Sequence, residues 1–366
     1  MLYIKRSVIS WQAFFVLFVN NDYVCRGLFV EYLVDHICYN YTKLMDGNLN
    51  LTWNANQDFL DVYTELVKQI DAGNHCYNYK IKELRSKVFQ HTVAIVKQGY
   101  YLVDFDRKVY LDEQNKMVDN TQFYCDEFRV DEILSAANCQ TEVSVVKEDY
   151  LAEGIRLKAE GYNPAVVNMA SLYTPGGGAY SGAGAQEETI FRRTNICLSL
   201  YQFAEFANVY GLKKSQFQYP LDANYGGIYT PNAVVFRGGL QSGFSLMDTP
   251  VTMSFISVAP ISRPELTSDG MLAESLVEQV KNKIRTILRI GLKHQHDALV
   301  MEAFGCSSFR NPPKHIARLF HEILNETEFK NKFRHISFAI TEDHNSFRKH
   351  NPEGNFKPFF EEFCRA

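Results

Sequence analysis

The sequence predicts an α/β fold in which a mixed, largely parallel sheet is covered by helices on both faces. From about residue 140, strand-like and helix-like segments alternate, as they do where helices join the strands of one sheet. The apolar runs Ala165–Asn168 and Ala298–Ala303 are short and continuous, which is typical of strands buried on both faces. A mainly helical N-terminal extension, residues 1–80, precedes this domain.

The segments before residue 140 predict two helices and an antiparallel edge. Residues Gln57–Ile70 place apolar side chains at helical spacing, and the polar stretch Asp71–Asn74 ends this helix. We take that stretch as the boundary between the extension, residues 1–80, and a domain that spans residues 81–366. A second helix is predicted next, followed by strand-like segments typical of a hairpin or sheet edge: Ile81–Lys97, then Tyr100–Phe105, Lys108–Leu111 and Gln122–Phe128.

After residue 140 the alternation assigns each segment in order. The predicted strands are Val143–Val146, Ala165–Asn168, Asn232–Phe236, Thr252–Val258, Ala298–Ala303 and His335–Ile340. The predicted helices are Asp149–Glu160, Gln186–Val209, Leu272–Ile290 and Pro313–Leu324. Ligands of such sheets bind where strands end and helices begin, so the loops after Asn168 and Ala303 are the candidates for a site.

Charge and cysteine content narrow the possible functions. The formal net charge of −4 argues against electrostatically driven nucleic-acid binding, so an anionic ligand must be held by local amides. Eight scattered cysteines, with no CxxC pair and no metal-ligand spacing, indicate reduced thiols and no metal or redox cofactor. We therefore expect a cytoplasmic protein, or a nuclear one if its source is eukaryotic.

The N-terminal apolar run Ala13–Val19 weakly resembles a signal sequence. It lacks a small-residue cleavage pattern, so a buried structural element is the favoured interpretation. The run is also far shorter than the roughly 20 apolar residues of a membrane span. We expect no association with a membrane.

The loop after Asn168 holds three consecutive glycines, Gly176 to Gly178, and then, after a spacer of seven residues, the triplet Gln186-Glu187-Glu188. Glycines let main-chain amides approach a ligand closely, and a loop that feeds a helix N-terminus suits a diphosphate or a ribose. A flexible surface loop before an acidic first helical turn is the alternative, because the helix dipole favours carboxylates there. The order and spacing of these residues favour the ligand site.

This arrangement resembles the signature of poly(ADP-ribose) glycohydrolases, most closely the microbial-type branch, over about residue 81 to the C-terminus. The resemblance implies a macrodomain-like fold that binds ADP-ribose, with Glu188 as the catalytic acid and Glu187 orienting the scissile ribose. It also implies that Gln186, the three glycines and Asn168 contact the substrate. Ser171 departs from the pattern, since many macrodomains have an asparagine there.

The chemistry of the two glutamates fits a division of roles. Cleavage of a glycosidic bond needs an acid that protonates the leaving oxygen of an oxocarbenium-like transition state. Glu187 and Glu188 are adjacent, roughly 100° apart around a helix axis, so they cannot flank a sugar as an opposed pair. One acid and one ribose-positioning group is the sensible assignment. The helix N-terminus lowers a carboxyl pKa, whereas burial and the neighbouring carboxylate raise it, and we expect the raising effects to dominate.

The loop after Ala303 is the second candidate for phosphate binding. Its small residues Gly305, Cys306, Ser307 and Ser308 expose amides, and Phe309 is placed to pack on a ribose or base. The alternative is a strand-to-helix turn whose phenylalanine fills the core. The family's second diphosphate loop has the same form, which favours binding. Cys306 is not favoured as a nucleophile, since no histidine is near it in sequence.

The leading hypothesis is a glycosidase that hydrolyses the ribose–ribose bonds of poly(ADP-ribose) and releases ADP-ribose. A non-catalytic ADP-ribose reader and a hydrolase of mono-ADP-ribosylated proteins are the alternatives. The expected partner is poly(ADP-ribose) or an ADP-ribosylated protein, and the sequence does not decide the oligomeric state. Arg192 and Arg193 could meet phosphate, but a solvated helix face is the favoured interpretation.

Overall fold

The computed structural model describes residues 51–73, 78–104, 106–130, 140–343 and 345–364, and residues from Leu49 onward belong to one unit. The helical segments are η1 Asn56–Leu60, α3 Asp61–Asp71, α4 Asn78–Gln98, α5 Gln114–Asp119, α6 Tyr150–Ala159, α7 Gln186–Arg193, α8 Ile196–Tyr201, η4 Ala207–Tyr210, η5 Leu240–Ser242, α9 Glu274–Lys293, α10 Pro313–Leu324 and α11 Phe356–Phe363. The strands are β1 Tyr100–Val103, β2 Arg107–Tyr110, β3 Gln122–Tyr124, β4 Glu142–Val146, β5 Pro164–Met169, β6 Gly227–Arg237, β7 Leu246–Val258, β8 Ala298–Met301 and β9 His335–Ala339.

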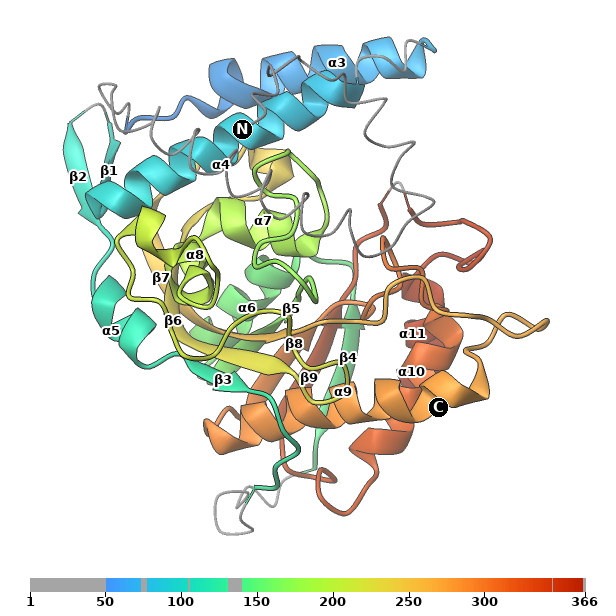
Figure 1. Cartoon of the computed structure of the whole chain (residues 1–366). Coiled ribbons are helices and arrows are strands. Elements are labelled where there is room, and N and C mark those ends of the chain that lie inside the picture. The colour runs from blue at the N-terminus through green and yellow to red at the C-terminus, as the bar shows by residue number, and fades with distance from the viewer. Residues whose placement is uncertain (1–50, 74–77, 105, 131–139, 344, 365–366) are drawn as a thin grey trace, which may run out of the picture. The chain divides into compact units, whose positions relative to one another are not determined.

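The central sheet confirms the predicted fold class. Seven strands lie in the order β3-β6-β7-β5-β8-β9-β4 (Figure 1). From β7 to β4 every neighbouring pair is parallel, whereas β3, β6 and β7 pair antiparallel at the other edge. The hairpin of β1 and β2 forms a separate two-stranded sheet. The mixed sheet is therefore largely parallel.

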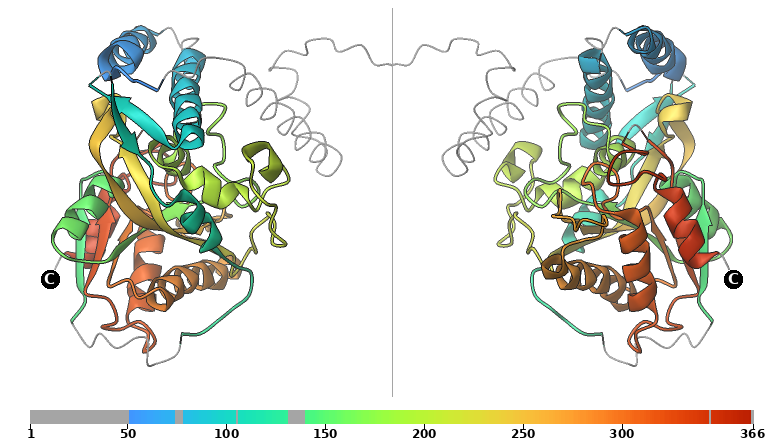
Figure 2. Two further views of the ribbon diagram at one scale, coloured as in Figure 1. Left: turned by 90° about the vertical axis from the view of Figure 1, so that its left-hand side faces the viewer. Right: turned by 90° about the vertical axis from the view of Figure 1, so that its right-hand side faces the viewer.

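Helices cover both faces of this sheet, and the residues of β5 show why. Ala165 and Val167 belong to the apolar cluster that includes Ile287 of α9 and Phe320 of α10. Val166 points the other way, where a Cβ on Gly154 of α6 would lie 3.0 Å from it. Figure 2 shows α6 and α9 on opposite sides of the sheet. Because successive side chains of a strand face opposite sides, a strand covered on both faces must be apolar throughout.

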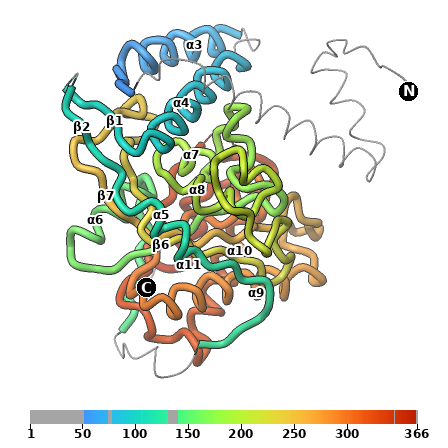
Figure 3. The backbone as a smooth tube through the Cα atoms, turned by 60° about the vertical axis from the view of Figure 1, so that its left-hand side comes forward, coloured from blue at the N-terminus to red at the C-terminus, as the bar shows by residue number. Residues whose placement is uncertain are grey.

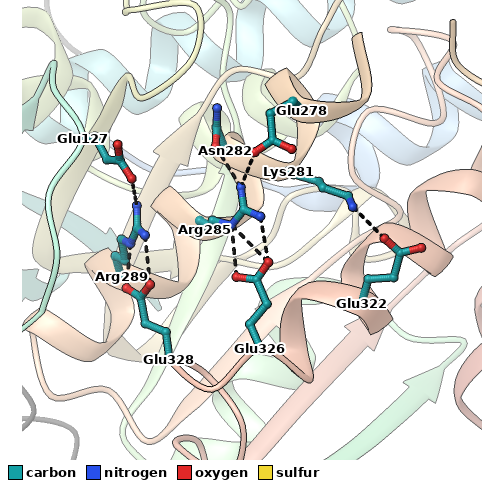
Figure 4. Close-up of polar contacts among 9 residues, drawn as sticks. All are labelled: Glu127, Glu278, Lys281, Asn282, Arg285, Arg289, Glu322, Glu326 and Glu328. Atoms are coloured by element: carbon teal, nitrogen blue, oxygen red, sulfur yellow. Dashed lines mark hydrogen bonds and ion pairs between the residues drawn. The ribbon is translucent and has the colours of Figure 1, made fainter. Parts of the chain in front are cut away.

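Ion pairs join α9 to α10 and the turn that follows it (Figure 4). Arg285 pairs with Glu326 at 2.7 Å, Arg289 pairs with Glu328 at 2.7 Å, and Lys281 pairs with Glu322 at 2.8 Å. Exposed pairs of this kind stabilise a fold by about 0–1 kcal/mol each. The Arg289 side chain is only 3% exposed, so the loss of Glu328 would leave a buried charge without its main partner.

The described residues of the N-terminal extension pack on the domain. Phe59 and Leu66 form a small apolar cluster with Leu84 of α4 and with Phe244, and Figure 3 shows α3 alongside α4. The indole of Trp53 donates a 2.9 Å hydrogen bond to the carbonyl of Gly243. The boundary near residue 80 stays a prediction, and the apolar run 13–19 lies outside the described residues. Within the described ranges no helix is long and apolar enough to cross a membrane.

The prediction of one long helix from Gln186 to Val209 is wrong. The chain leaves the helix at Thr194, whose backbone is extended and forms a β-bridge with Val235. The Asn195 side chain then accepts a 2.7 Å hydrogen bond from the amide of Val234. These contacts with β6 outweigh the helical periodicity and divide the segment into α7, α8 and η4.

Candidate active site

The candidate site lies where two neighbouring parallel strands end. β5 pairs with β8, so the loops that follow them leave the sheet at the same edge. The first loop, residues 170–185, leads into α7, and the second loop, residues 302–312, leads into α10. The amide of Gly305 in the second loop donates to the sulfur of Met169 at the end of β5, at 3.1 Å. This contact holds the second loop against the start of the first.

Glu187 is buried, and the first loop wraps around its carboxyl group. The amide of Ser171 donates to one oxygen at 2.7 Å and the amide of Gly176 donates to the other at 2.9 Å. Burial and the neighbouring Glu188 raise the pKa of Glu187 to about 8, while these two amides and the Asn168 side chain act in the opposite direction. Both oxygens are fixed by the backbone, so this carboxyl group has a defined orientation.

Glu188 is also buried, but its two oxygens differ. Oε1 accepts a 2.9 Å hydrogen bond from the amide of Gly178. Oε2 is buried and has no hydrogen-bond partner among the described residues. A buried carboxyl oxygen without a partner is costly, because it has lost water and gained nothing in return. One oxygen is thus fixed by the protein and the other is available to a ligand.

The three glycines bring the first loop against both carboxyl groups. A Cβ added to Gly177 would lie 2.6 Å from Glu188 Oε1 and 3.1 Å from Glu187 Oε2, and its φ of +51° also disfavours other residues. The amides of Gly176 and Gly178 are used by the two glutamates, and the amide of Gly177 donates to the Thr174 carbonyl at 3.1 Å. Within the structure the glycines therefore position the acids.

Gln186 and Asn168 form hydrogen bonds with the strands next to the glutamates, and their roles differ. Gln186 accepts a 2.7 Å hydrogen bond from the amide of Met169 and donates one of 2.9 Å to the Val167 carbonyl, so it braces α7 on β5. Asn168 donates to the Ser257 hydroxyl at 3.0 Å. The Asn168 Oδ1 atom is buried with no partner among the described residues, so it is a second free acceptor at this site.

The second loop is anchored through its carbonyls and side chains. Asn311 donates to the Gly305 carbonyl at 3.0 Å, His350 contacts the Cys306 carbonyl at 2.8 Å, and Ser307 donates to Asp343 at 2.6 Å. The backbone amides of Ser307, Ser308 and Phe309 have no hydrogen-bond acceptor among the described residues. Consecutive amides without acceptors are suited to an anion.

Phe309, Phe304 and Cys306 of the second loop differ in how far they are buried. Phe309 is partly exposed, whereas Phe304 is buried and contacts Phe320 edge-on. Phe304, not Phe309, therefore fills the core. Cys306 is fully buried, and burial holds the pKa of its thiol well above the ordinary value, which disfavours a thiolate nucleophile.

The prediction of a solvated face for Arg192 and Arg193 is wrong. Arg192 is fully buried and donates to the carbonyls of Arg85, at 3.0 Å, and Ala183. Burial lowers the pKa of Arg192 to about 9, against the pull of the nearby Glu188 charge. Arg193 pairs with Asp149 at 2.7 Å. The sequence carried a signal for Arg192, because it lies four residues after Glu188 on the same helical face.

Two tyrosines, Tyr201 at the end of α8 and Tyr219 in the connection from α8 to β6, also reach this region, and no motif in the sequence pointed to them. Tyr201 and Tyr219 both lie close enough to Glu187 for its charge to raise the pKa of their hydroxyls, after the larger effect of burial. No group of three or more His, Cys, Asp or Glu side chains placed to hold a metal ion occurs in the part of the chain that the structure describes.

The fold and site define the class of protein: an α/β domain whose ligand site lies at the carboxyl ends of parallel strands and contains two buried glutamates. Residues 89–238 match the family model described as microbial-type PARG, catalytic domain. No curated protein sequence matches the chain. The matched segment contains the glycine triplet and the Gln-Glu-Glu triplet, so the match agrees with the family predicted from those residues.

Solved structures support this assignment over more of the chain. The poly(ADP-ribose) glycohydrolase of Thermomonospora curvata bound to the inhibitor ADP-HPD is 27% identical, with a TM-score of 0.59, over 77% of this chain and 98% of that chain. The poly(ADP-ribose) glycohydrolase of Deinococcus radiodurans in complex with ADP-ribose is 27% identical, with a TM-score of 0.52, over 70% of this chain and 100% of that chain. The similarity therefore extends well beyond residues 89–238.

Proposed function

We propose that the chain is a poly(ADP-ribose) glycohydrolase that cleaves ribose–ribose bonds and releases ADP-ribose, with Glu188 as the general acid. The observation that carries this proposal is the asymmetry of the Glu188 carboxyl group. Its Oε1 is fixed by Gly178, while its buried Oε2 has no partner among the described residues. A general acid needs one oxygen free to hold a proton and reach the leaving group.

The residues of the site divide the reaction between them. Glu188 Oε2 gives its proton to the leaving oxygen as the bond from that oxygen to the anomeric carbon breaks. The ribose becomes oxocarbenium-like, water adds to the anomeric carbon, and the proton that water releases returns to Glu188. Glu187, fixed by the amides of Ser171 and Gly176, orients the ribose through its hydroxyls. Arg192, near the end of α7, ties this helix to the carbonyls of Arg85 and Ala183.

The remaining site residues hold the rest of the ADP-ribose unit. The amides of Ser307, Ser308 and Phe309 bind the diphosphate, and the partly exposed Phe309 ring packs on the adjacent ribose. Gly305 and Cys306 shape this loop. Asn168 Oδ1 accepts from a ribose hydroxyl, and Gly176 to Gly178 line the same ribose. The ligands of the two bacterial relatives, ADP-HPD and ADP-ribose, support ADP-ribose as the bound unit.

The substitution Glu188→Gln tests the proposal, because it keeps the shape of the side chain and removes the proton. We expect release of ADP-ribose from poly(ADP-ribose) to fall by about 10²–10⁴-fold, the usual contribution of a general acid. Calorimetric binding of ADP-ribose should persist. Glu153→Gln is the matched control, since Glu153 is buried in α6 and pairs with Arg156 outside the site.

The outcomes separate the alternatives. Wild-type turnover by Glu188→Gln excludes Glu188 as the acid. Binding of ADP-ribose by the wild type with no turnover of any substrate identifies a reader. Faster release from mono-ADP-ribosylated protein than from polymer identifies a mono-ADP-ribosyl hydrolase. Absence of ADP-ribose binding by the folded wild type overturns the proposal as a whole.

A further inference from the structure

The hydroxyl of Tyr219 is a buried polar group that the proposed mechanism does not use. Its oxygen is buried and has no hydrogen-bond partner among the described residues, although the residue as a whole is partly exposed. A hydroxyl can both donate and accept, so leaving it unpaired inside a protein is unfavourable. Such a cost at one specific atom points to a ligand that supplies the missing partner.

The backbone places Tyr219 at the active site. The Tyr219 amide donates to the Phe203 carbonyl at 3.0 Å, and the Leu221 amide donates to the Leu172 carbonyl in the first loop at 2.9 Å. The segment that holds Tyr219 is therefore tied to the loop that wraps around Glu187. Burial, and then the charge of Glu187, raise the pKa of the Tyr219 hydroxyl, which agrees with this placement.

Three buried oxygens without a partner among the described residues belong to side chains that interact with Glu187. Asn168 Oδ1 comes from the end of β5, Glu188 Oε2 from the start of α7, and the Tyr219 hydroxyl from the connection to β6. Each of these side chains acts on the pKa of Glu187 or responds to its charge. Elements far apart in the sequence therefore contribute unsatisfied polar atoms from side chains that interact with Glu187. A sugar with adjacent hydroxyls is a ligand that could satisfy all three.

We propose that the Tyr219 hydroxyl hydrogen-bonds the ribose that Glu187 and Asn168 hold, and so discriminates ADP-ribose from ligands that lack this ribose. The inference rests on the proposed function and adds a specificity-determining contact to it. The contact lies on the sugar side of the site, away from the second loop that takes the diphosphate.

Calorimetry with ADP-ribose and with ADP tests this contact, because ADP keeps the diphosphate and lacks the second ribose. In Tyr219→Phe we expect the affinity for ADP-ribose to fall about five- to tenfold, the effect of one neutral hydrogen bond. The affinity for ADP should be unchanged. The thermal midpoint of unfolding should not fall, because the lost hydroxyl has no hydrogen-bond partner in the part of the chain that the structure describes.

Tyr101→Phe is the matched control. Tyr101 is fully buried, and its hydroxyl donates to the Met247 carbonyl at 2.6 Å, outside the site. This variant should lose thermal stability and keep the wild-type ratio of ADP-ribose to ADP affinity. A wild-type ratio in Tyr219→Phe, or an equal loss for both ligands, overturns the inference. If the wild-type protein binds ADP and ADP-ribose equally or binds neither, the proposed function fails instead.

Discussion

The two loops of the site share a sequence character but do different work. Both follow parallel strands, lead into helices and contain glycine with a positive φ, at Gly177 and Gly305. In the first loop the glycine amides are used by the protein, two of them by the glutamates. In the second loop the amides of residues 307–309 have no acceptor among the described residues. The first loop therefore positions the two glutamates, whereas the free amides of the second loop support its proposed role in binding an anion.

Of the substitutions within the two loops, Gly177→Ala should produce the largest effect, because it acts where the first loop meets both carboxyl groups. The new methyl group would lie 2.6 Å from Glu188 Oε1, so the glutamates or the loop must shift. We expect kcat for poly(ADP-ribose) to fall about a hundredfold, the scale of a small misplacement of catalytic groups. Steady-state release of ADP-ribose measures it.

Gly161→Ala is the control for backbone strain alone. Gly161 has a φ of +85°, and a Cβ there meets nothing within 4 Å. This variant should lose about 1 kcal/mol of unfolding free energy and keep wild-type kcat. Equal kcat values for Gly177→Ala and wild type would show that the first loop does not position the acids.

The stability of the folded protein should depend on pH through the buried carboxyl group of Glu187. Burial and Glu188 raise the pKa of Glu187 from 4.5 to about 8, so the folded state retains a proton that the unfolded state loses. This favourable contribution is complete below pH 4.5 and is lost as the pH rises toward 8, at no more than about 1.4 kcal/mol per pH unit. Glu187→Gln removes it, so denaturant titrations should show the variant gaining on wild type as the pH rises. A constant difference between pH 5 and 8 would contradict the raised pKa.

Gly305→Ala should have the smallest effect, and it should lower the affinity for ADP-ribose more than kcat. Its φ is +73°, and the added Cβ would lie 2.6 Å from Asn311 Nδ2 and 2.7 Å from Pro260 Cβ, which displaces the second loop. We expect calorimetric affinity for ADP-ribose to fall about tenfold, as for loss of one good charge-assisted hydrogen bond.

At saturating polymer, kcat of Gly305→Ala should stay close to wild type, because the glutamates are untouched. Gly211→Ala is its control, since Gly211 has a φ of +70° and open space around it. A loss of kcat with unchanged affinity would reverse the roles assigned to the two loops.

The sheet could be predicted from the sequence because the apolar pattern of a buried strand is local. Val166 and Val167 must both be apolar when helices cover both faces, and that run is visible without coordinates. The break of the helix at Thr194 was not visible, because the competing partners Val234 and Val235 lie some 40 positions away in the chain. Local periodicity predicts a helix there, and only the strand decides against it.

By itself, the sequence predicted the chemistry of the site: the glycine triplet, the spacing to Glu188 and the small residues of the second loop resemble the family's pattern. The tertiary structure decided how those groups are used. It buried Arg192 beside Glu188, assigned the amides of Gly176 and Gly178 to the glutamates, and brought Tyr219 to Glu187. The physical reason is that burial and hydrogen bonding depend on neighbours in space, and those neighbours come from segments that share no pattern with the motif.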